Sequence, residues 1–180
     1  MDFAILYGIQ DTIACPPLDA LMAFVTALGD HGLIWIIVGI VLLIFRKTRR
    51  WGITLLVTLG ITWLICEYGV KTLVARPRPF MLDPTYALLI APPSGFSFPS
   101  GHTLASFLAA TVITFSPIAR GWKVAAWVVA VLIAFSRLYL FVHFPTDVLA
   151  GAIIGTLAGL VGVWVSNRVA SSRSSTGTIS

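Results

Sequence analysis

Long apolar runs, interrupted only by short polar turns, constrain this chain more than any other feature of its sequence. Of the 180 residues, 58% are hydrophobic and 11% are charged, and the mean hydropathy is +0.95. A soluble domain of this length needs far more polar surface to cover its core, so the runs are predicted to face lipid. The chain is long enough for about six membrane spans of roughly 20 residues each, joined by short loops.

Six apolar runs are predicted to form transmembrane helices. They are Leu18–Leu28, Leu33–Phe45, Trp51–Val70, Leu104–Phe115, Val124–Val142 and Val148–Val165. Residues 1–17 are only mildly apolar and are expected to lie at the membrane interface, whereas the Ser-rich residues 171–180 are expected to form a disordered tail. We therefore predict an all-α, polytopic transmembrane bundle of about six helices that forms a single domain over residues 1–170.

The positive charges predict how this bundle is oriented. The net charge is +5, but Lys and Arg lie in short loops and form no basic stripe with interleaved aromatic residues, so nucleic-acid binding is not expected. If the Arg46–Arg50 loop faces the cytoplasm, eight cations fall on that side and four on the other. The positive-inside rule then places the long connection, residues 71–99, on the outer face.

Three glycines in the last apolar run recur at every fourth position. Gly151, Gly155 and Gly159 therefore share one face of the predicted helix. Small residues at this spacing allow a second helix to approach closely, so we expect this face to serve helix packing.

Three blocks of polar residues fall at the outer ends of predicted spans, where ionisable groups are costly and by default mark function. Their members are Lys71, Arg78 and Pro79; Pro99, Ser100, Gly101 and His102; and Ser136, Arg137, His143 and Asp147. The Lys and Arg residues supply three cations, and each guanidinium can bind two phosphate oxygens. Ser100 and Gly101 stand at the start of a predicted helix, whose free N–H groups form an anion site. A ligand with at least two negative charges is expected, which indicates phosphate.

The two histidines predict the chemistry at this phosphate. Asp147 lies four residues after His143 and can accept a hydrogen bond from one imidazole nitrogen, which leaves the other free to attack phosphorus. His102 can protonate the departing oxygen and later help water to hydrolyse the phosphohistidine. The carboxylates of Asp83, Asp147 and Glu67 are scattered along the sequence, so we predict catalysis without a metal ion or other cofactor.

In order and spacing, the three blocks resemble the signature KxxxxxxRP…PSGH…SRxxxxxHxxxD of the type 2 phosphatidic acid phosphatase family, with all eleven specified positions matched. This family includes bacterial undecaprenyl diphosphate phosphatases and phosphatidylglycerophosphate phosphatases, and it is similar to glucose-6-phosphatase and vanadium haloperoxidases. The resemblance implies a six-helix bundle in the bacterial cytoplasmic (inner) membrane, with its active site near the outer surface. It implies His143 as nucleophile, His102 as acid/base and Asp147 as the group that orients His143. The implied phosphate-binding residues are Lys71, Arg78, Ser100, Gly101 and Arg137.

The predicted function is hydrolysis of the terminal phosphate of a lipid diphosphate. Membrane lipids are expected to surround the protein. The resemblance and the compact size favour undecaprenyl diphosphate, while phosphatidylglycerophosphate, phosphatidate and lipid A phosphates are alternatives. A non-enzymatic carrier of lipid phosphates or other anions would need the cations but not both histidines. The membrane setting argues against haloperoxidase chemistry with bound vanadate, and the sequence does not specify the oligomeric state.

Three further ionisable residues lie near these blocks. Glu67 precedes Lys71 by four residues and is expected to hold it through an ion pair. Asp30 and His31 lie on an outward turn, where we expect them to cap helices, a role at the site being the alternative.

Overall fold

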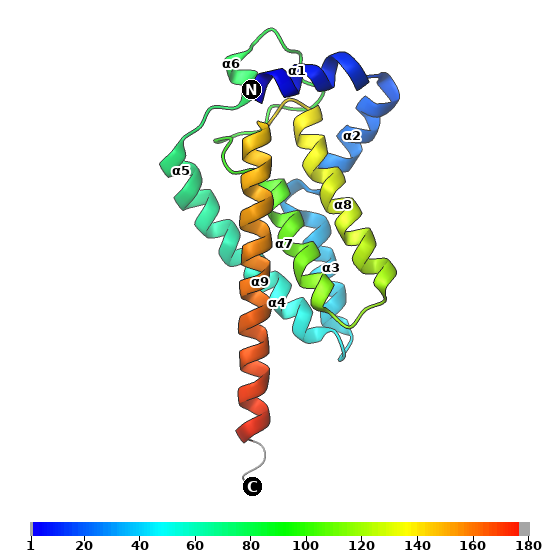
Figure 1. Cartoon of the computed structure of the whole chain (residues 1–180), viewed down its shortest axis with the longest axis vertical. Helices are drawn as coiled ribbons and strands as arrows, with labels where there is room; N and C mark the ends of the chain where they lie inside the picture. The colour runs from blue at the N-terminus through cyan, green and yellow to red at the C-terminus, as the bar shows by residue number, and fades with distance from the viewer. Residues whose placement is uncertain (1, 177–180) are drawn as a thin grey trace.

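The computed structural model describes residues 2–176, and within this range the chain consists of helices and connecting segments without a strand. In chain order (Figure 1), the elements are α1 (Asp2–Ile13), α2 (Pro16–Leu28), η1 (Asp30–Gly32), α3 (Leu33–Ile44), α4 (Arg49–Leu64), η2 (Ile65–Val70), α5 (Lys71–Val74), α6 (Pro79–Leu82), α7 (Gly101–Phe115), α8 (Arg120–Tyr139) and α9 (Pro145–Thr176). The predicted all-α architecture is confirmed.

Three helical stretches of the described chain, which begin at Arg49, Arg120 and Pro145, are long and apolar enough to cross a membrane. The pair α2 and α3 passes the same test together, although its two halves are bent by 45° at the turn between them, and α7 is apolar but shorter. The six predicted apolar runs thus correspond to the six bundle helices α2, α3, α4, α7, α8 and α9. By this criterion the described residues contain three full-length crossings, or four if α2 and α3 form one bent crossing, and α7 is too short to pass the test.

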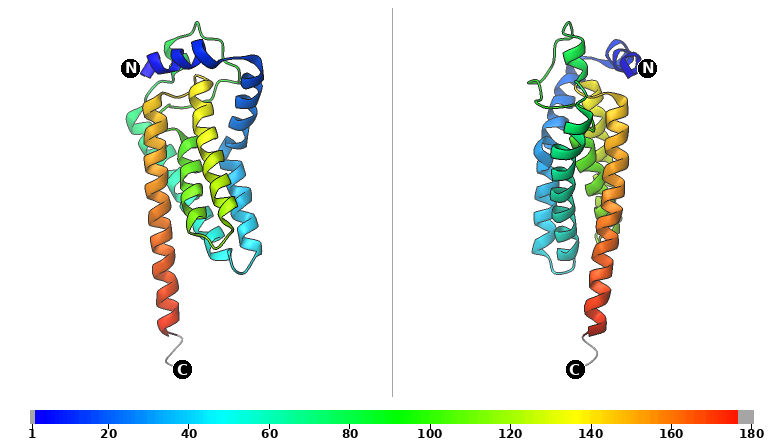
Figure 2. Two further views of the ribbon diagram at one scale, coloured as in Figure 1. Left: turned by 45° about the vertical axis from the view of Figure 1, so that its right-hand side comes forward. Right: turned by 90° about the vertical axis from the view of Figure 1, so that its left-hand side faces the viewer.

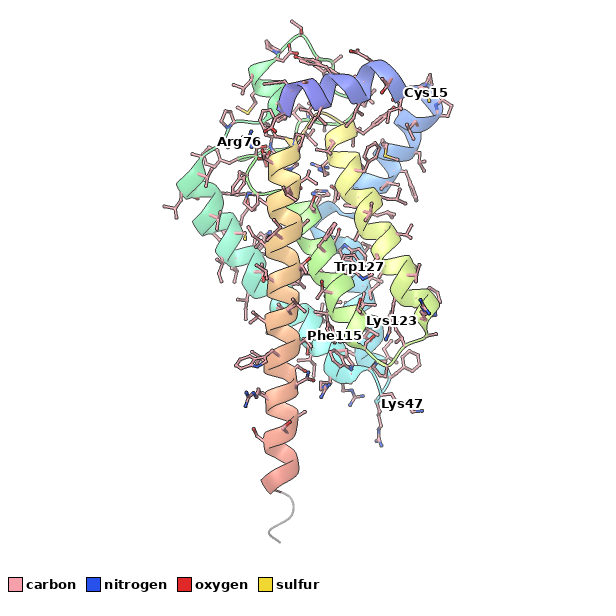
Figure 3. All side chains as sticks on the ribbon, in the orientation of Figure 1. Cys15, Lys47, Arg76, Phe115, Lys123 and Trp127 are labelled. Atoms are coloured by element: carbon pink, nitrogen blue, oxygen red, sulfur yellow. The ribbon has the colours of Figure 1, made fainter. Side chains whose placement is uncertain are left out.

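The two ends of the bundle differ. At one end, α1 lies across the helix ends beside the long connection of residues 71–99, and the N-terminus of α9 and the C-terminus of α8 meet there (Figure 2). Lys47 and Lys123 lie toward the other end, far from Arg76 (Figure 3). Helix α9 continues through residues 171–176, which the sequence suggested as part of a tail, while residues 177–180 lie outside the described range.

Helix α7 occupies the centre of the bundle. Its residues Leu108, Ala109, Ala110 and Val112 are completely buried. The same helix carries buried Ser106, whose hydroxyl accepts a hydrogen bond of 2.9 Å from the indole nitrogen of Trp35 on α3. A polar group at this depth has no water to bond with, so the pair satisfies both side chains.

The glycine face of α9 packs directly on the backbone of α7, as predicted. A Cβ atom added to Gly151 would lie 2.7 Å from the Ser100 carbonyl oxygen, and one added to Gly155 would lie 2.3 Å from the Leu104 carbonyl oxygen. Gly159 is similarly crowded, one turn further along. The absence of side chains at these positions therefore fixes both the separation and the register of the two helices.

We expect Gly155→Ala to destabilise the protein, because the added methyl group would force α7 and α9 apart. Overpacking of this kind costs about 1–3 kcal/mol, which should appear as a lower thermal unfolding midpoint in detergent. Gly60→Ala on α4 is the matched control, since a Cβ there would meet nothing within 4 Å. Equal midpoints for the two variants would contradict the proposed role of the glycine face.

Candidate active site

The contact between α7 and α9 brings the second and third sequence blocks together. Ser100 is the N-cap of α7, and its hydroxyl accepts a hydrogen bond from the backbone N–H of Thr103. The backbone N–H of Ser100 donates to the carbonyl oxygen of Asp147 at 3.1 Å. Helix α7 therefore begins at Gly101, as predicted, and its first turn lies beside the first turn of α9.

The side chain of Asp147 stabilises the N-terminus of α9. Its Oδ2 atom accepts a hydrogen bond of 2.9 Å from the backbone N–H of Phe144, three residues earlier, as an acidic residue at the third helical position commonly does. Pro145 fits the first helical position, where no N–H is needed. Because His143 immediately precedes this cap, the start of α9 also determines where the imidazole lies.

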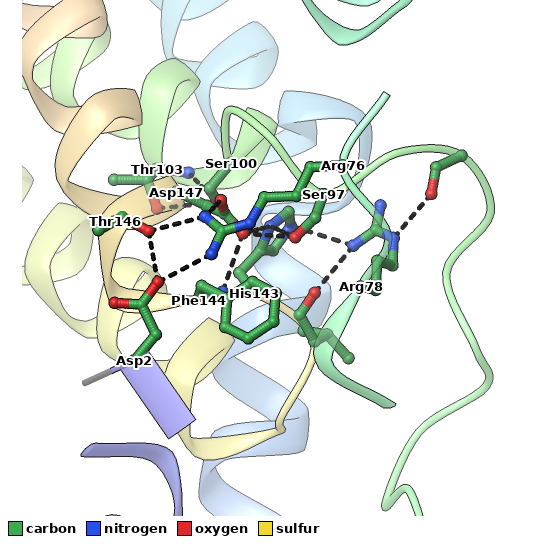
Figure 4. Close-up of polar contacts among 12 residues, drawn as sticks. Asp2, Arg76, Arg78, Ser97, Ser100, Thr103, His143, Phe144, Thr146 and Asp147 are labelled. Carbon is green, nitrogen blue, oxygen red and sulfur yellow. Dashed lines mark hydrogen bonds and ion pairs between the residues drawn. The ribbon is translucent and has the colours of Figure 1, made fainter. Parts of the chain in front are cut away.

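The imidazole of His143 is buried, with its Nδ1 atom directed toward Asp147 (Figure 4). The distance from Nδ1 to Asp147 Oδ2 is 3.6 Å, slightly longer than a hydrogen bond. Ser97, which was not predicted, lies between them: its hydroxyl donates to Asp147 Oδ2 and is 3.4 Å from His143 Nδ1. Asp147 and Ser97 together face one edge of the ring and leave Nε2 on the other.

Arg78 lies against this second edge. Its Nη1 atom is 3.1 Å from His143 Nε2 and donates to the carbonyl oxygen of Val142 at 3.1 Å. Its Nε and Nη2 atoms donate to the carbonyl oxygens of Gly95 and Ser94, each at 3.0 Å. Backbone carbonyls thus fix the guanidinium beside the nitrogen that was predicted to attack phosphorus.

Arg76, the outer cation that belongs to no sequence block, compensates the charge of Asp147. The Asp147 side chain is fully buried, and an unpaired carboxylate there would be strongly destabilising. Arg76 Nη1 donates to Asp147 Oδ1 at 2.6 Å, while Nη2 donates to Asp2 Oδ2 on α1 at 2.8 Å. The signature has no position for Arg76, so only the folded chain reveals this partner.

Arg137 and His102 form the other half of the site. Arg137 is buried, and its Nη1 atom donates to Thr26 Oγ1 and lies 3.5 Å from His102 Nε2. Its Nε atom is buried without a hydrogen-bond partner among the described residues. Buried guanidinium donors are rarely left unpaired, so an oxygen-rich anion would complete the environment of this side chain.

Lys71 is the predicted phosphate ligand that the structure does not join to the others. Its Nζ atom forms an ion pair of 2.7 Å with Glu67, which confirms the predicted pairing of these two residues. No hydrogen bond or ion pair between described residues connects Lys71 to the histidines or to the buried arginines. Lys71 directly follows the π-helical turn η2, a distortion that is frequent at functional sites.

His143 is held in its neutral form, which the predicted attack on phosphorus would require. Burial lowers the pKa of His143, and the nearby charges of Arg137 and Arg78 lower it further, against the opposing effect of Asp147. At neutral pH the ring therefore carries a single proton. The edge that faces Asp147 and Ser97 favours that proton on Nδ1, which leaves a lone pair on Nε2.

Two imidazoles and two buried arginines at one end of an apolar helical bundle define the class: a membrane protein equipped to bind an anion and to exchange protons with it. The chain belongs to the PAP2 superfamily, whose family model matches residues 51–170. It is similar to the undecaprenyl-diphosphatase of Sulfolobus acidocaldarius, with 38% identity over 150 residues that cover 82% of this chain and 70% of that protein.

Solved structures agree with this assignment. Aquifex aeolicus LpxE has a TM-score of 0.77 and 31% identity, and the match covers 90% of this chain and 94% of that chain. A transmembrane PAP2-type phosphatidylglycerolphosphate phosphatase from Bacillus subtilis has a TM-score of 0.76 and 31% identity. This match covers 93% of this chain and 85% of that chain. The protein is therefore an integral membrane phosphatase of the PAP2 type, as the sequence blocks predicted.

The neutral state of His143 predicts a pH-dependent stability. The unfolded chain protonates His143 near its ordinary pKa of about 6.5, whereas the folded protein resists protonation, so stability is full above that pH and falls below it. We expect the thermal unfolding midpoint of the wild type to decrease between about pH 7 and about pH 5 more steeply than that of His143→Gln. Parallel curves for the two proteins would contradict the inferred environment of His143.

Proposed function

We propose that the protein hydrolyses the terminal phosphate of a lipid diphosphate, with undecaprenyl diphosphate as its preferred substrate. The observation that carries this proposal is the arrangement of both histidines around the same cations. His143 Nε2 lies 3.1 Å from Arg78 and His102 Nε2 lies 3.5 Å from Arg137. Arg137 is close enough to both imidazoles for its charge to act on each.

In the first step, His143 Nε2 attacks phosphorus while the bond from phosphorus to the leaving oxygen breaks. His102 donates a proton to that oxygen, so the lipid phosphate leaves without an added negative charge. Asp147, assisted by Ser97, retains the Nδ1 proton of His143 and stabilises the positive charge that develops on the ring. The product of this step is a phosphohistidine.

In the second step, His102 takes a proton from water as the water oxygen attacks phosphorus and the phosphorus–nitrogen bond breaks. Phosphate leaves and His143 returns to its neutral form. The guanidinium groups of Arg78 and Arg137 hold the phosphoryl oxygens in both steps, with Lys71 as a further cation. Backbone N–H groups at the start of α7, beside Ser100 and Gly101, bind the same oxygens.

The position of the site supports a lipid substrate. It lies at the end of the bundle where α1 crosses the helix ends, opposite Lys47 and Lys123 (Figure 3), and the positive-inside rule then directs it outward from a bacterial inner membrane. The similarity to undecaprenyl-diphosphatase supports the isoprenoid diphosphate. The similarity to the Bacillus phosphatidylglycerolphosphate phosphatase supports phosphatidylglycerophosphate as a second candidate.

Arginines take the part that metal ions play in many phosphoryl-transfer enzymes, so we propose catalysis without a metal. The described residues contain no group of three or more His, Cys, Asp or Glu side chains arranged to hold a metal ion. The test is phosphate release by purified protein in EDTA with undecaprenyl diphosphate, phosphatidylglycerophosphate, phosphatidate and lipid A. We expect release in EDTA, with the highest kcat/KM for undecaprenyl diphosphate. Loss of activity that added Mg²⁺ restores would contradict the metal-free mechanism.

His143→Ala tests the nucleophile. Its removal should reduce phosphate release by at least roughly a thousandfold while binding of the lipid product changes little. His31→Asn is the matched control, because it replaces an exposed histidine whose φ of 53° asparagine also adopts readily. Release by His143→Ala at the normal rate would refute the assignment, and lipid binding by a wild type that releases no phosphate would favour the anion carrier.

A further inference from the structure

The bend between α2 and α3 lies outside the residues that the family model matches, yet three of its residues contact the site. Thr26 accepts a hydrogen bond from Arg137 Nη1. Gly29 leaves space for the ring of His102, since a Cβ atom at Gly29 would lie 2.7 Å from His102 Cδ2. Asp30 Oδ1 lies 2.9 Å from His102 Nε2.

We propose that Asp30 is a positioning residue for His102, which it orients and whose proton-donating form it stabilises. This inference rests on the proposed function, in which His102 is the general acid. The carboxylate accepts the Nε2–H of His102, so the second ring nitrogen, Nδ1, becomes the one that serves the substrate. An orienting carboxylate of this kind already faces the nucleophile, and Asp30 provides the corresponding group for the acid.

The charges around His102 explain why a carboxylate is needed there. Arg137 on α8 approaches Nε2 to 3.5 Å, and Arg78 in the long connection is close enough for its charge to act on the same ring. Burial first, and then both cations, disfavour the protonated imidazole, which a general acid must nevertheless populate. Asp30 on η1 is the carboxylate that the described structure places against this ring, and it opposes both cations.

The shape of the bend directs Asp30 toward α7. His31 and Gly32 adopt positive φ angles of 53° and 70°, and the chain bends by 45° here between α2 and α3. The Asp30 side chain is 56% exposed, whereas that of His102 is 18% exposed. The pair thus lies at the bend between α2 and α3, with the carboxylate on the exposed side and the imidazole largely covered.

The proton movements balance with Asp30 ionised throughout. In the first step, the Nδ1 proton of His102 passes to the leaving oxygen as its bond to phosphorus breaks. In the second step, Nδ1 accepts a proton from the attacking water. The Nε2 proton stays in the hydrogen bond to Asp30, whose charge stabilises the imidazolium whenever His102 carries both protons.

Two soluble substrates test the effect of Asp30 on proton donation by His102 independently of which lipid the enzyme prefers. Phenyl phosphate releases a basic phenolate that needs a proton, whereas p-nitrophenyl phosphate releases an anion that leaves without one. We expect Asp30→Asn to lower kcat/KM for phenyl phosphate by roughly 10- to 100-fold, as the loss of a charged hydrogen bond would. For p-nitrophenyl phosphate we expect a change of less than about threefold, because general-acid assistance adds little there.

The pH profile provides a readout that a structural role would not change. The basic limb of kcat/KM for phenyl phosphate should move to lower pH in Asp30→Asn, because His102 loses its proton more readily without the carboxylate. Asp30→Glu, which keeps the charge, should recover part of the loss. Asp11→Asn, at an exposed carboxylate on α1, is the control and should match the wild type.

Equal losses on both substrates with an unmoved basic limb would overturn the proposal and leave Asp30 a structural role only. Unchanged kcat/KM for phenyl phosphate would overturn it as well. His143→Ala, measured alongside, separates the two hypotheses, since its activity reports on the nucleophile whatever Asp30 does. Failure of every lipid to act as substrate would refute the proposed lipid specificity and leave the comparison between the two soluble substrates intact.

Discussion

The backbone contact between α7 and α9 is the constraint on which the rest of the site depends. Glycines at 151 and 155 let the two helices approach until carbonyl oxygens of α7 occupy the space where side chains would otherwise lie. This contact aligns the two N-termini, so the N-cap of α7 bonds directly to the first turn of α9. A histidine at each N-terminus then faces the same group of cations. Packing between the bundle helices therefore determines the geometry of the candidate site.

Much of this arrangement was predictable because each block is local in sequence. The apolar runs predicted the bundle helices, and the helix start signals predicted the N-terminus of α7. The four-residue spacing predicted both the glycine face and the ion pair of Glu67 with Lys71. The fold brings all three blocks into contact, because Arg78 of the first block lies against His143 of the third and Ser100 of the second block bonds to Asp147 of the third. Binding of phosphate by Lys71 remains a prediction.

Ser97 was not predicted, Arg76 was counted only as an outer cation, and for Asp30 a role at the site was the alternative to helix capping, because the contacts of all three join distant segments. Ser97 bonds to a carboxylate 50 residues away, Arg76 to the same carboxylate 71 residues away, and Asp30 to a histidine 72 residues away. No periodicity or local spacing connects such positions. The buried charge of Asp147 requires a compensating cation, and only the folded chain shows that Arg76 supplies it.

The ion pairs of Arg76 join α1 to α9 and so have a consequence for biogenesis. Arg76 precedes α7, α8 and α9 in the sequence, whereas its partner Asp147 lies in the first turn of α9, the last described helix. Until α9 docks, His143 has neither the cap that Asp147 forms at Phe144 nor the carboxylate beside its ring. Assembly of the candidate site therefore coincides with the docking of this last helix.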